Sequence, residues 1–123
     1  MVSGGNSGSS AWVFAQAVLG KQHVALVGVD FSYAPGTPLE KTQSYKELMD
    51  LFGDDYADAY ISVHNPYLKE TWYTDPSYYW YRQTFLQMAK LADCTTYNCS
   101  EGGILTGKGV RFLPLQDFLS VHA

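Results

Sequence analysis

Residues 23–27, His-Val-Ala-Leu-Val, form an apolar and β-branched run that ends at Gly28 and Asp30. A short run of this kind, without polar alternation, is typical of a strand that is covered on both faces. Such strands belong to parallel sheets, because crossover helices cover both faces of a parallel sheet. The run therefore predicts an α/β chain with residues 23–27 as the central strand of a mostly parallel sheet.

Residues 10–19 are apolar nearly all round, and Gly20 follows them as a stop signal. A short helix that is apolar on every side packs between other elements, so we expect this helix to be buried. Ser9 or Ser10 is the expected N-cap, because a serine hydroxyl can accept a hydrogen bond from a free amide of the first turn.

Helical and strand patterns alternate along the rest of the chain, which predicts a three-layer, Rossmann-like α/β sandwich in one domain, residues 1–123. Spacing and start signals, such as a capping Asp before a Pro, predict six further elements. They are helices at residues 42–52, 74–91 and 114–119, and strands at residues 60–63, 95–99 and 110–113.

Charge and cysteine content exclude several classes of protein. A net charge of −4, with only eight Lys and Arg, predicts neither a nucleic-acid-binding nor a membrane-binding protein. No segment reaches the run of about 18 apolar residues that a membrane span needs, and the N-terminus does not resemble a signal peptide. Cys94 and Cys99 are interpreted as two reduced thiols, so we expect a cytoplasmic protein.

A loop rich in Gly and Ser, residues 3–10, precedes the first expected helix. Its glycines let the backbone approach a ligand, and the helix start offers free amides with partial positive charge. The loop lacks the Gly-Lys-Ser/Thr ending of a P-loop. The alternative is a flexible N-terminus whose last serine caps the helix. On the ligand hypothesis the binding residues are Gly5, Asn6, Ser7, Gly8, Ser9 and Ser10.

The segment that follows residues 23–27 is the second candidate site, because ligands of open α/β sheets bind at the carboxyl ends of strands. The carboxylate of Asp30 can accept from a sugar hydroxyl or hold a divalent ion beside phosphates. The alternative is that Asp30 only caps the next turn. The candidate ligand-binding residues are Asp30, Phe31, Ser32 and Tyr33.

The third candidate segment follows the expected strand at residues 95–99 and ends in a double glycine. The alternative here is a simple turn. If all three tips lie at one edge of the sheet, we expect them to converge on one cleft. The candidate binding residues are Asn98, Ser100, Glu101, Gly102 and Gly103.

Aromatic residues are concentrated in residues 67–81, with His64 and Arg82 on either side. Such a stretch can stack a base, a pterin or a sugar ring, while tyrosine hydroxyls and Arg82 contact phosphate. The alternative is that most of these rings belong to the core or to an interface, since neighbours on one helix cannot all face one site. His64 is a candidate base or an ordinary surface histidine.

Three motifs in this order resemble one family: GGNSGSSA at residues 4–11, LVGVDFSY at 26–33, and NCSEGGIL at 98–105 with LQDFL at 115–119. They resemble the domain shared by archaeal 6-hydroxymethylpterin diphosphokinases and motility-accessory-factor glycosyltransferases. The first two motifs also resemble, more distantly, bacterial sialyltransferases that use a CMP-sugar. The resemblance spans residues 3–119.

The resemblance implies a nucleotide-dependent transferase that moves a diphosphate from ATP to a hydroxylated acceptor. The Gly/Ser loop would hold phosphates, and Asp30 would lie at the ligand or at a Mg²⁺ ion. The rival enzyme is a glycosyltransferase that uses a nucleotide-sugar, in which Tyr33 steadies the departing phosphate and His64 acts as base. Asp30 and His64 are therefore the candidate catalytic residues. A non-catalytic nucleotide-binding or assembly module is the third interpretation.

The resemblance covers only the second half of the family domain, so we expect a truncated half of a larger fold. A sheet without its partner strands has an unpaired edge, which favours pairing with a second copy. Tyr and Trp are enriched where proteins bury surfaces against each other. With the aromatic stretch at residues 67–81, this predicts a two-fold homodimer.

Overall fold

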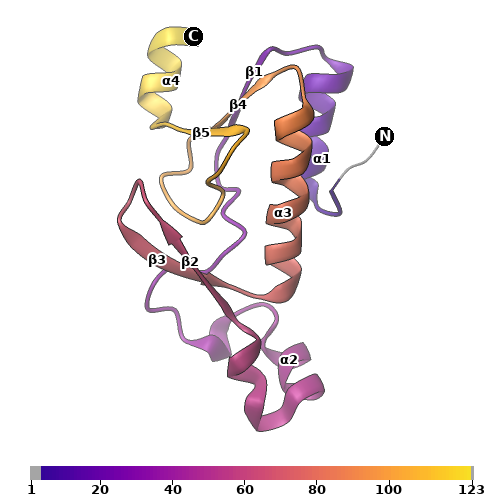
Figure 1. Cartoon of the computed structure of the whole chain (residues 1–123), viewed down its shortest axis with the longest axis vertical. Coiled ribbons are helices and arrows are strands. Elements are labelled where there is room, and N and C mark those ends of the chain that lie inside the picture. Colours follow the sequence, from indigo (N-terminus) through magenta and orange to yellow (C-terminus); the bar gives the residue numbers. More distant parts are fainter. Residues whose placement is uncertain (1–3, 123) are drawn as a thin grey trace.

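The computed structural model describes residues 4–122 and shows a mixed α/β fold with a three-stranded parallel sheet (Figure 1). Ser3, the first residue of the expected ligand loop, lies outside the described residues. The helices are α1 (Ser7–Val13), continued by a π-helical turn (Phe14–Val18), α2 (Tyr45–Phe52), α3 (Pro76–Leu91) and α4 (Leu115–His122), with 3-10 turns at Leu39–Lys41 and Gly53–Ala59. The strands are β1 (His23–Leu26), β2 (Ile61–Asn65), β3 (Glu70–Thr74), β4 (Thr95–Asn98) and β5 (Val110–Phe112).

The parallel sheet has the order β1-β4-β5, so β4 is its central strand. His23 pairs with Thr95, and Thr96 pairs with Val110. The prediction that residues 23–27 form the central strand is wrong, because within residues 4–122 β1 pairs with β4 only and lies at an edge. Val27, just after β1, is 61% exposed. An apolar run indicates a strand but does not determine its place in the sheet.

Helices pack on both faces of this sheet. On one face Trp12 of α1 donates from Nε1 to Thr96 Oγ1 at 2.9 Å. On the other face Phe118 of α4 makes an edge contact with Tyr97, with 5.1 Å between ring centroids. Because successive side chains of a strand point to opposite faces, α1 and α4 lie on opposite sides of β4. Trp12 and Phe85 form the centre of the core between α1, α3 and the sheet.

The first helix begins earlier and is less buried than its sequence predicts. Asn6 is the N-cap, and its Oδ1 accepts from the amide of Ser9 at 2.9 Å. Ser9 and Ser10 therefore lie inside the helix. Trp12 is 2% exposed, but Phe14 is 52% exposed. The helix covers one face of a narrow sheet, and no described element covers its outer side, so burial on all sides is wrong.

The aromatic stretch contains a strand that its composition conceals. β3 pairs with β2 in an antiparallel hairpin, with Ile61 opposite Thr74. Asn65 Oδ1 accepts from the amides of Tyr67 and Leu68 and so forms the turn. The hairpin is separate from the parallel sheet and lies between it and α2 (Figure 1). A half-buried strand is recognised by alternating polar and apolar residues, and consecutive aromatic residues obscure this alternation.

The helix α3 begins where the sequence predicts. Asp75 caps it, with Oδ1 accepting from the amide of Tyr78 at 2.9 Å, and Pro76 occupies its first turn. The predictions of α2, α4, β2, β4 and β5 are also confirmed, with ends that differ by a few residues. No helix within residues 4–122 is long and apolar enough to cross a membrane.

Candidate functional site

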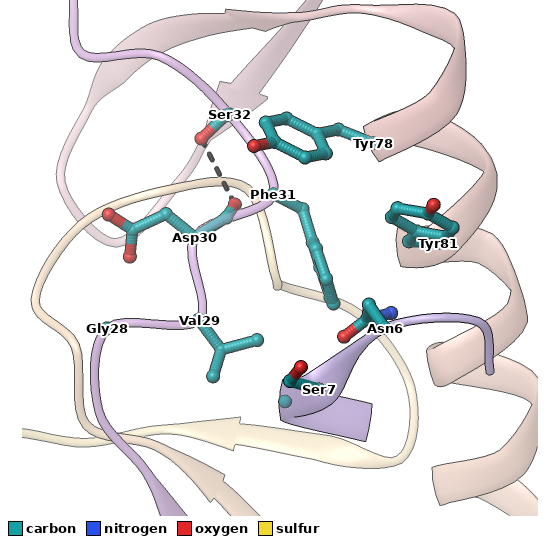
Figure 2. Close-up of a pocket in the computed structure, with 10 residues that line it drawn as sticks. Asn6, Ser7, Gly28, Val29, Asp30, Phe31, Ser32, Tyr78 and Tyr81 are labelled. Carbon is teal, nitrogen blue, oxygen red and sulfur yellow. Dashed lines mark hydrogen bonds between the residues drawn. The ribbon is translucent and has the colours of Figure 1, made fainter. Parts of the chain in front are cut away.

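A cavity of about 350 Å³ opens beyond the carboxyl end of β1, between the start of α1 and the first turns of α3 (Figure 2). Two of the three segments singled out in the sequence meet here. The lining residues come from the Gly/Ser loop, the segment after β1 and α3: Asn6, Ser7, Gly8, Gly28, Val29, Asp30, Phe31, Ser32, Tyr78 and Tyr81.

The turn at Asp30 and Phe31 has a backbone that its neighbours hold in place. Phe31 has φ of 53°, in the left-handed region that bulky residues rarely adopt. Thr74 Oγ1 donates to the Phe31 carbonyl at 2.6 Å, and the Ile104 amide donates to the Asp30 carbonyl at 3.1 Å. Strained backbone of this kind concentrates at ligand sites. In Figure 2 the Phe31 ring points toward Asn6 across the cavity.

The carboxylate of Asp30 turns away from the rings of Phe31, Tyr78 and Tyr81 (Figure 2). Its Oδ1 is buried and has no hydrogen-bond partner among residues 4–122. Burial raises the pKa of this carboxyl, because desolvation disfavours the charged form. The buried Oδ1 of Asp30 therefore lacks a protein partner among the described residues, and the carboxylate lies on the side of the turn away from these rings.

Some residues of the Gly/Ser loop stabilise the loop itself, and others line the cavity. Asn6 Nδ2 donates to Ser9 Oγ at 2.9 Å, and Ser9 is fully buried. These two polar groups hold the loop in its turn, although Asn6 also lines the cavity. Ser7 and Gly8 line it as well, whereas Gly5, Ser9 and Ser10 do not. A Cβ on Gly8 would lie 3.3 Å from Val29 Cγ2, so a larger residue would narrow the cavity.

The third segment supports the site but does not line it. Ser100 Oγ accepts from the Gly28 amide at 2.9 Å, which ties the ends of β4 and β1 together. Asn98 Nδ2 donates to the Leu105 carbonyl at 3.0 Å. This buried side-chain amide therefore joins the two ends of the loop between residues 98 and 105. The remaining predicted binding residues of the segment, Glu101, Gly102 and Gly103, also lie outside the lining.

Ser32 lines the cavity, whereas its neighbour Tyr33 does not. Ser32 Oγ donates to the Asp30 carbonyl at 3.1 Å, the dashed contact in Figure 2, and Ser32 lines the cavity. Tyr33 Oη donates instead to Asp75 Oδ2 at 2.6 Å. Burial and this hydrogen bond raise the pKa of Tyr33 far above its ordinary range. Tyr33 does not line the cavity.

The two flanking basic residues also lie elsewhere. His64 is an exposed hairpin residue whose Nδ1 lies 3.3 Å from Thr71 Oγ1, and it does not line the cavity. Arg82 donates from Nε to the Ile104 carbonyl at 2.6 Å and from Nη2 to the Thr106 carbonyl at 3.0 Å. Its guanidinium therefore holds the loop before β5.

Tyr78 and Tyr81 are the lining residues that the sequence did not single out from the aromatic stretch. They lie three residues apart on α3, so their side chains share one face of the helix. Trp80, between them in sequence, is 58% exposed on another face. Helical spacing from the Asp75 cap is the signal that distinguishes this pair from its neighbours.

Metal ligands are sparse. Within residues 4–122 no group of three or more His, Cys, Asp or Glu side chains comes together. Asp30 is the one carboxylate among the described residues that line the cavity. Mg²⁺ is often bound through one or two carboxylates while waters and substrate phosphates complete its shell. Asp30 is therefore suited to be the one protein ligand of a Mg²⁺ ion that is already bound to a nucleotide.

No protein-family model, no curated protein and no solved structure matches this chain. The residues that line the cavity therefore carry the functional inference by themselves.

Proposed function

We propose that the chain is a nucleotide-dependent transferase-type domain that binds a nucleotide or a nucleotide-sugar in the cavity beyond β1. The observation that carries this proposal is the meeting of two turns, at Asn6 and at Asp30, on one cavity with Tyr78 and Tyr81. Cavities of about 300 to 1,000 Å³ with apolar rings and a few polar groups are typical of small-molecule sites.

The lining has an aromatic part, which suits the base of a nucleotide, and a part at the start of α1, which suits its phosphates. Phe31, Tyr78 and Tyr81 offer aromatic surface for a base, which stacks favourably on such rings. Ser7 and Gly8 lie in the first turn of α1, where backbone amides and the helix dipole favour phosphate. No Lys or Arg belongs to the described lining, so a bound Mg²⁺ would supply the positive charge, with Asp30 as its one protein ligand.

Among transfer reactions, we favour attack of an acceptor hydroxyl on the β-phosphorus of ATP, which breaks the link between the α- and β-phosphates, moves the diphosphate to the acceptor, and releases AMP and a proton. Phosphoryl transfer depends on positioning and charge neutralisation more than on covalent help from the protein. The glycosyltransferase alternative assigns roles to Tyr33 and His64, and neither side chain lines the cavity. Nucleotide binding without catalysis is the second candidate function, because Asp30 is the only carboxylate, and no histidine lines the described cavity.

The proposal also covers the architecture of the domain and its cellular compartment. Helices on both faces of the parallel sheet support a three-layer, Rossmann-like sandwich, in which ligands bind at strand ends. Cys94 and Cys99 are free thiols, which supports a reducing compartment, the cytoplasm.

Thermal unfolding with ligands tests the proposal. Mg²⁺ with ATP is expected to raise the melting temperature more than CMP does, and a ligand at 100 times its Kd stabilises by about 2.7 kcal/mol. Ser7→Asp places a negative charge where phosphate would bind, while favouring the helix through its dipole. Its matched control is Ser10→Asp, because Ser10 is also exposed on α1 but does not line the cavity.

Ser7→Asp is expected to abolish the shift with ATP, whereas Ser10→Asp keeps it. A larger shift with CMP would favour the nucleotide-sugar alternative. A shift without turnover of ATP and an acceptor would identify a binding module, and no shift with either nucleotide would overturn the proposal.

A further inference from the structure

Tyr78 and Tyr81 line a second cavity as well as the first. This second cavity, of about 250 Å³, lies between the start of α2 and the start of α3. Besides the two tyrosines, its lining consists of five polar residues: Gln43, Ser44, Glu47, Asp75 and Ser77. Molecules bound in the two cavities would therefore be separated by the side chains of Tyr78 and Tyr81.

The second cavity is rich in acceptors and negative charge. Glu47 and Asp75 contribute two carboxylates, and no Lys, Arg or His belongs to its described lining. Asp75 is 2% exposed, so its charge is poorly screened by solvent. A carboxylate buried to this degree is costly unless hydrogen bonds or an opposite charge compensate it.

Hydrogen bonds fix this carboxylate in place. Asp75 Oδ1 accepts from the Tyr78 amide at 2.9 Å, and Oδ2 accepts from Tyr33 Oη at 2.6 Å. A carboxylate oxygen has two lone pairs, so each retains capacity for a further donor. Tyr78 Oη donates to Gln43 Oε1, which holds its ring between the two cavities. Burial and then the charge of Asp75 raise the pKa of Tyr78. The negative potential of Asp75 therefore extends to a tyrosine that lines both cavities.

We infer that the second cavity binds the cationic nitrogen of a small molecule, an ammonium group beside Glu47 and Asp75 with the faces of Tyr78 and Tyr81 against it. An ammonium group donates three hydrogen bonds and accepts none, which matches an acceptor-rich lining. Tyrosine faces attract cations through their negative quadrupole. Anionic and purely apolar molecules are disfavoured by the same two carboxylates.

The rings of Tyr78 and Tyr81 separate this cavity from the nucleotide cavity, and the phosphates are proposed to lie at Ser7 and Gly8, which line only the first cavity. The ammonium site is therefore a site of its own. Binding of the ammonium group depends neither on a nucleotide nor on the proposed function.

Titration of the nucleotide-free chain, followed by the ring signals of ¹³C-labelled tyrosines, tests the inference. Ethanolamine is expected to shift the Tyr78 and Tyr81 signals, and ethylene glycol, its neutral counterpart, to shift them much less. Glu47→Gln is expected to weaken ethanolamine binding by about fivefold, the upper range for an exposed charge pair. Asp54→Asn, an exposed acidic residue outside the lining, makes the same charge change and is expected to have no effect.

Each outcome decides one claim. Absence of ethanolamine shifts at Tyr78 and Tyr81, equal shifts with ethylene glycol, or equal weakening by Glu47→Gln and Asp54→Asn would overturn the inference. Stabilisation by Mg²⁺ and ATP is measured in parallel and is expected to be unchanged in Glu47→Gln. Ethanolamine binding without any effect of ATP would overturn the proposed function, while the ammonium site would stand.

Discussion

A Cβ atom on Gly103 would lie 2.6 Å from the Cα of Asp30. The turn after β4 and the turn after β1 are therefore in backbone contact, with no room for a side chain between them. The Asp30 carbonyl accepts from the Ile104 amide at this contact. The third segment thus positions the candidate ligand residue through its backbone and not through its polar side chains.

Gly103→Ala is expected to destabilise the fold by about 2–4 kcal/mol, because it combines a left-handed backbone, φ of 82°, with a clash against backbone atoms. Gly36→Ala is the matched control, since Gly36 has φ of 86° but no atom within 4 Å of the added Cβ. It is expected to cost about 1 kcal/mol. Urea unfolding measures both, and equal losses would show that the contact with Asp30 contributes nothing.

Asp30→Asn is expected to stabilise the chain at pH 7. Burial raises the folded-state pKa of this carboxyl above its ordinary value of 3.8. Its contribution to stability is therefore complete below pH 3.8 and is lost as the pH rises through the folded-state pKa. Asparagine carries no such charge, so the advantage of the variant should disappear as the pH falls toward 3.8.

Urea unfolding of the wild-type chain and of Asp30→Asn at several pH values between 7 and 4 compares their stabilities. Asp54→Asn serves as the control, because an exposed substitution is expected to change stability by less than about 0.5 kcal/mol. An Asp30→Asn variant that is less stable than wild type at pH 7 would mean that the charged carboxylate has a stabilising partner.

A two-fold dimer remains a prediction, and the structure gives it a testable surface. β1 is an edge strand, and an unpaired strand edge can pair with the same edge of a second copy. Light scattering at micromolar concentration is expected to give twice the chain mass of 13.7 kDa. Val27→Lys, at the end of β1, is expected to return the mass to that of one chain, because a charge protects an edge.

Val121→Lys is the matched control for the dimer, since Val121 is also an exposed valine but lies on α4. It is expected to leave the mass unchanged. A wild-type mass of 13.7 kDa would rule out the dimer, and a dimer insensitive to Val27→Lys would place the interface away from β1.

The sequence by itself determined most elements through signals that are local. Asp75 followed by Pro76 starts α3 because a capping carboxylate and a fixed φ act within one turn. The run at residues 23–27 and the segment at 95–99 became strands because β-branched residues fit an extended backbone. The same local chemistry placed polar residues directly after β1, where Asp30 and Ser32 now line the cavity.

Only the tertiary structure decided which of these elements and side chains meet. The apolar run of β1 is compatible with a central or an edge position, and pairing with β4 alone placed it at the edge. Asn98 and Ser100 have the polar groups of ligand residues, but nearby backbone groups satisfy them first. Tyr78 and Tyr81 entered the site because packing of α3 turned their common face toward both cavities. Contacts between residues far apart in sequence depend on packing, which no local pattern encodes.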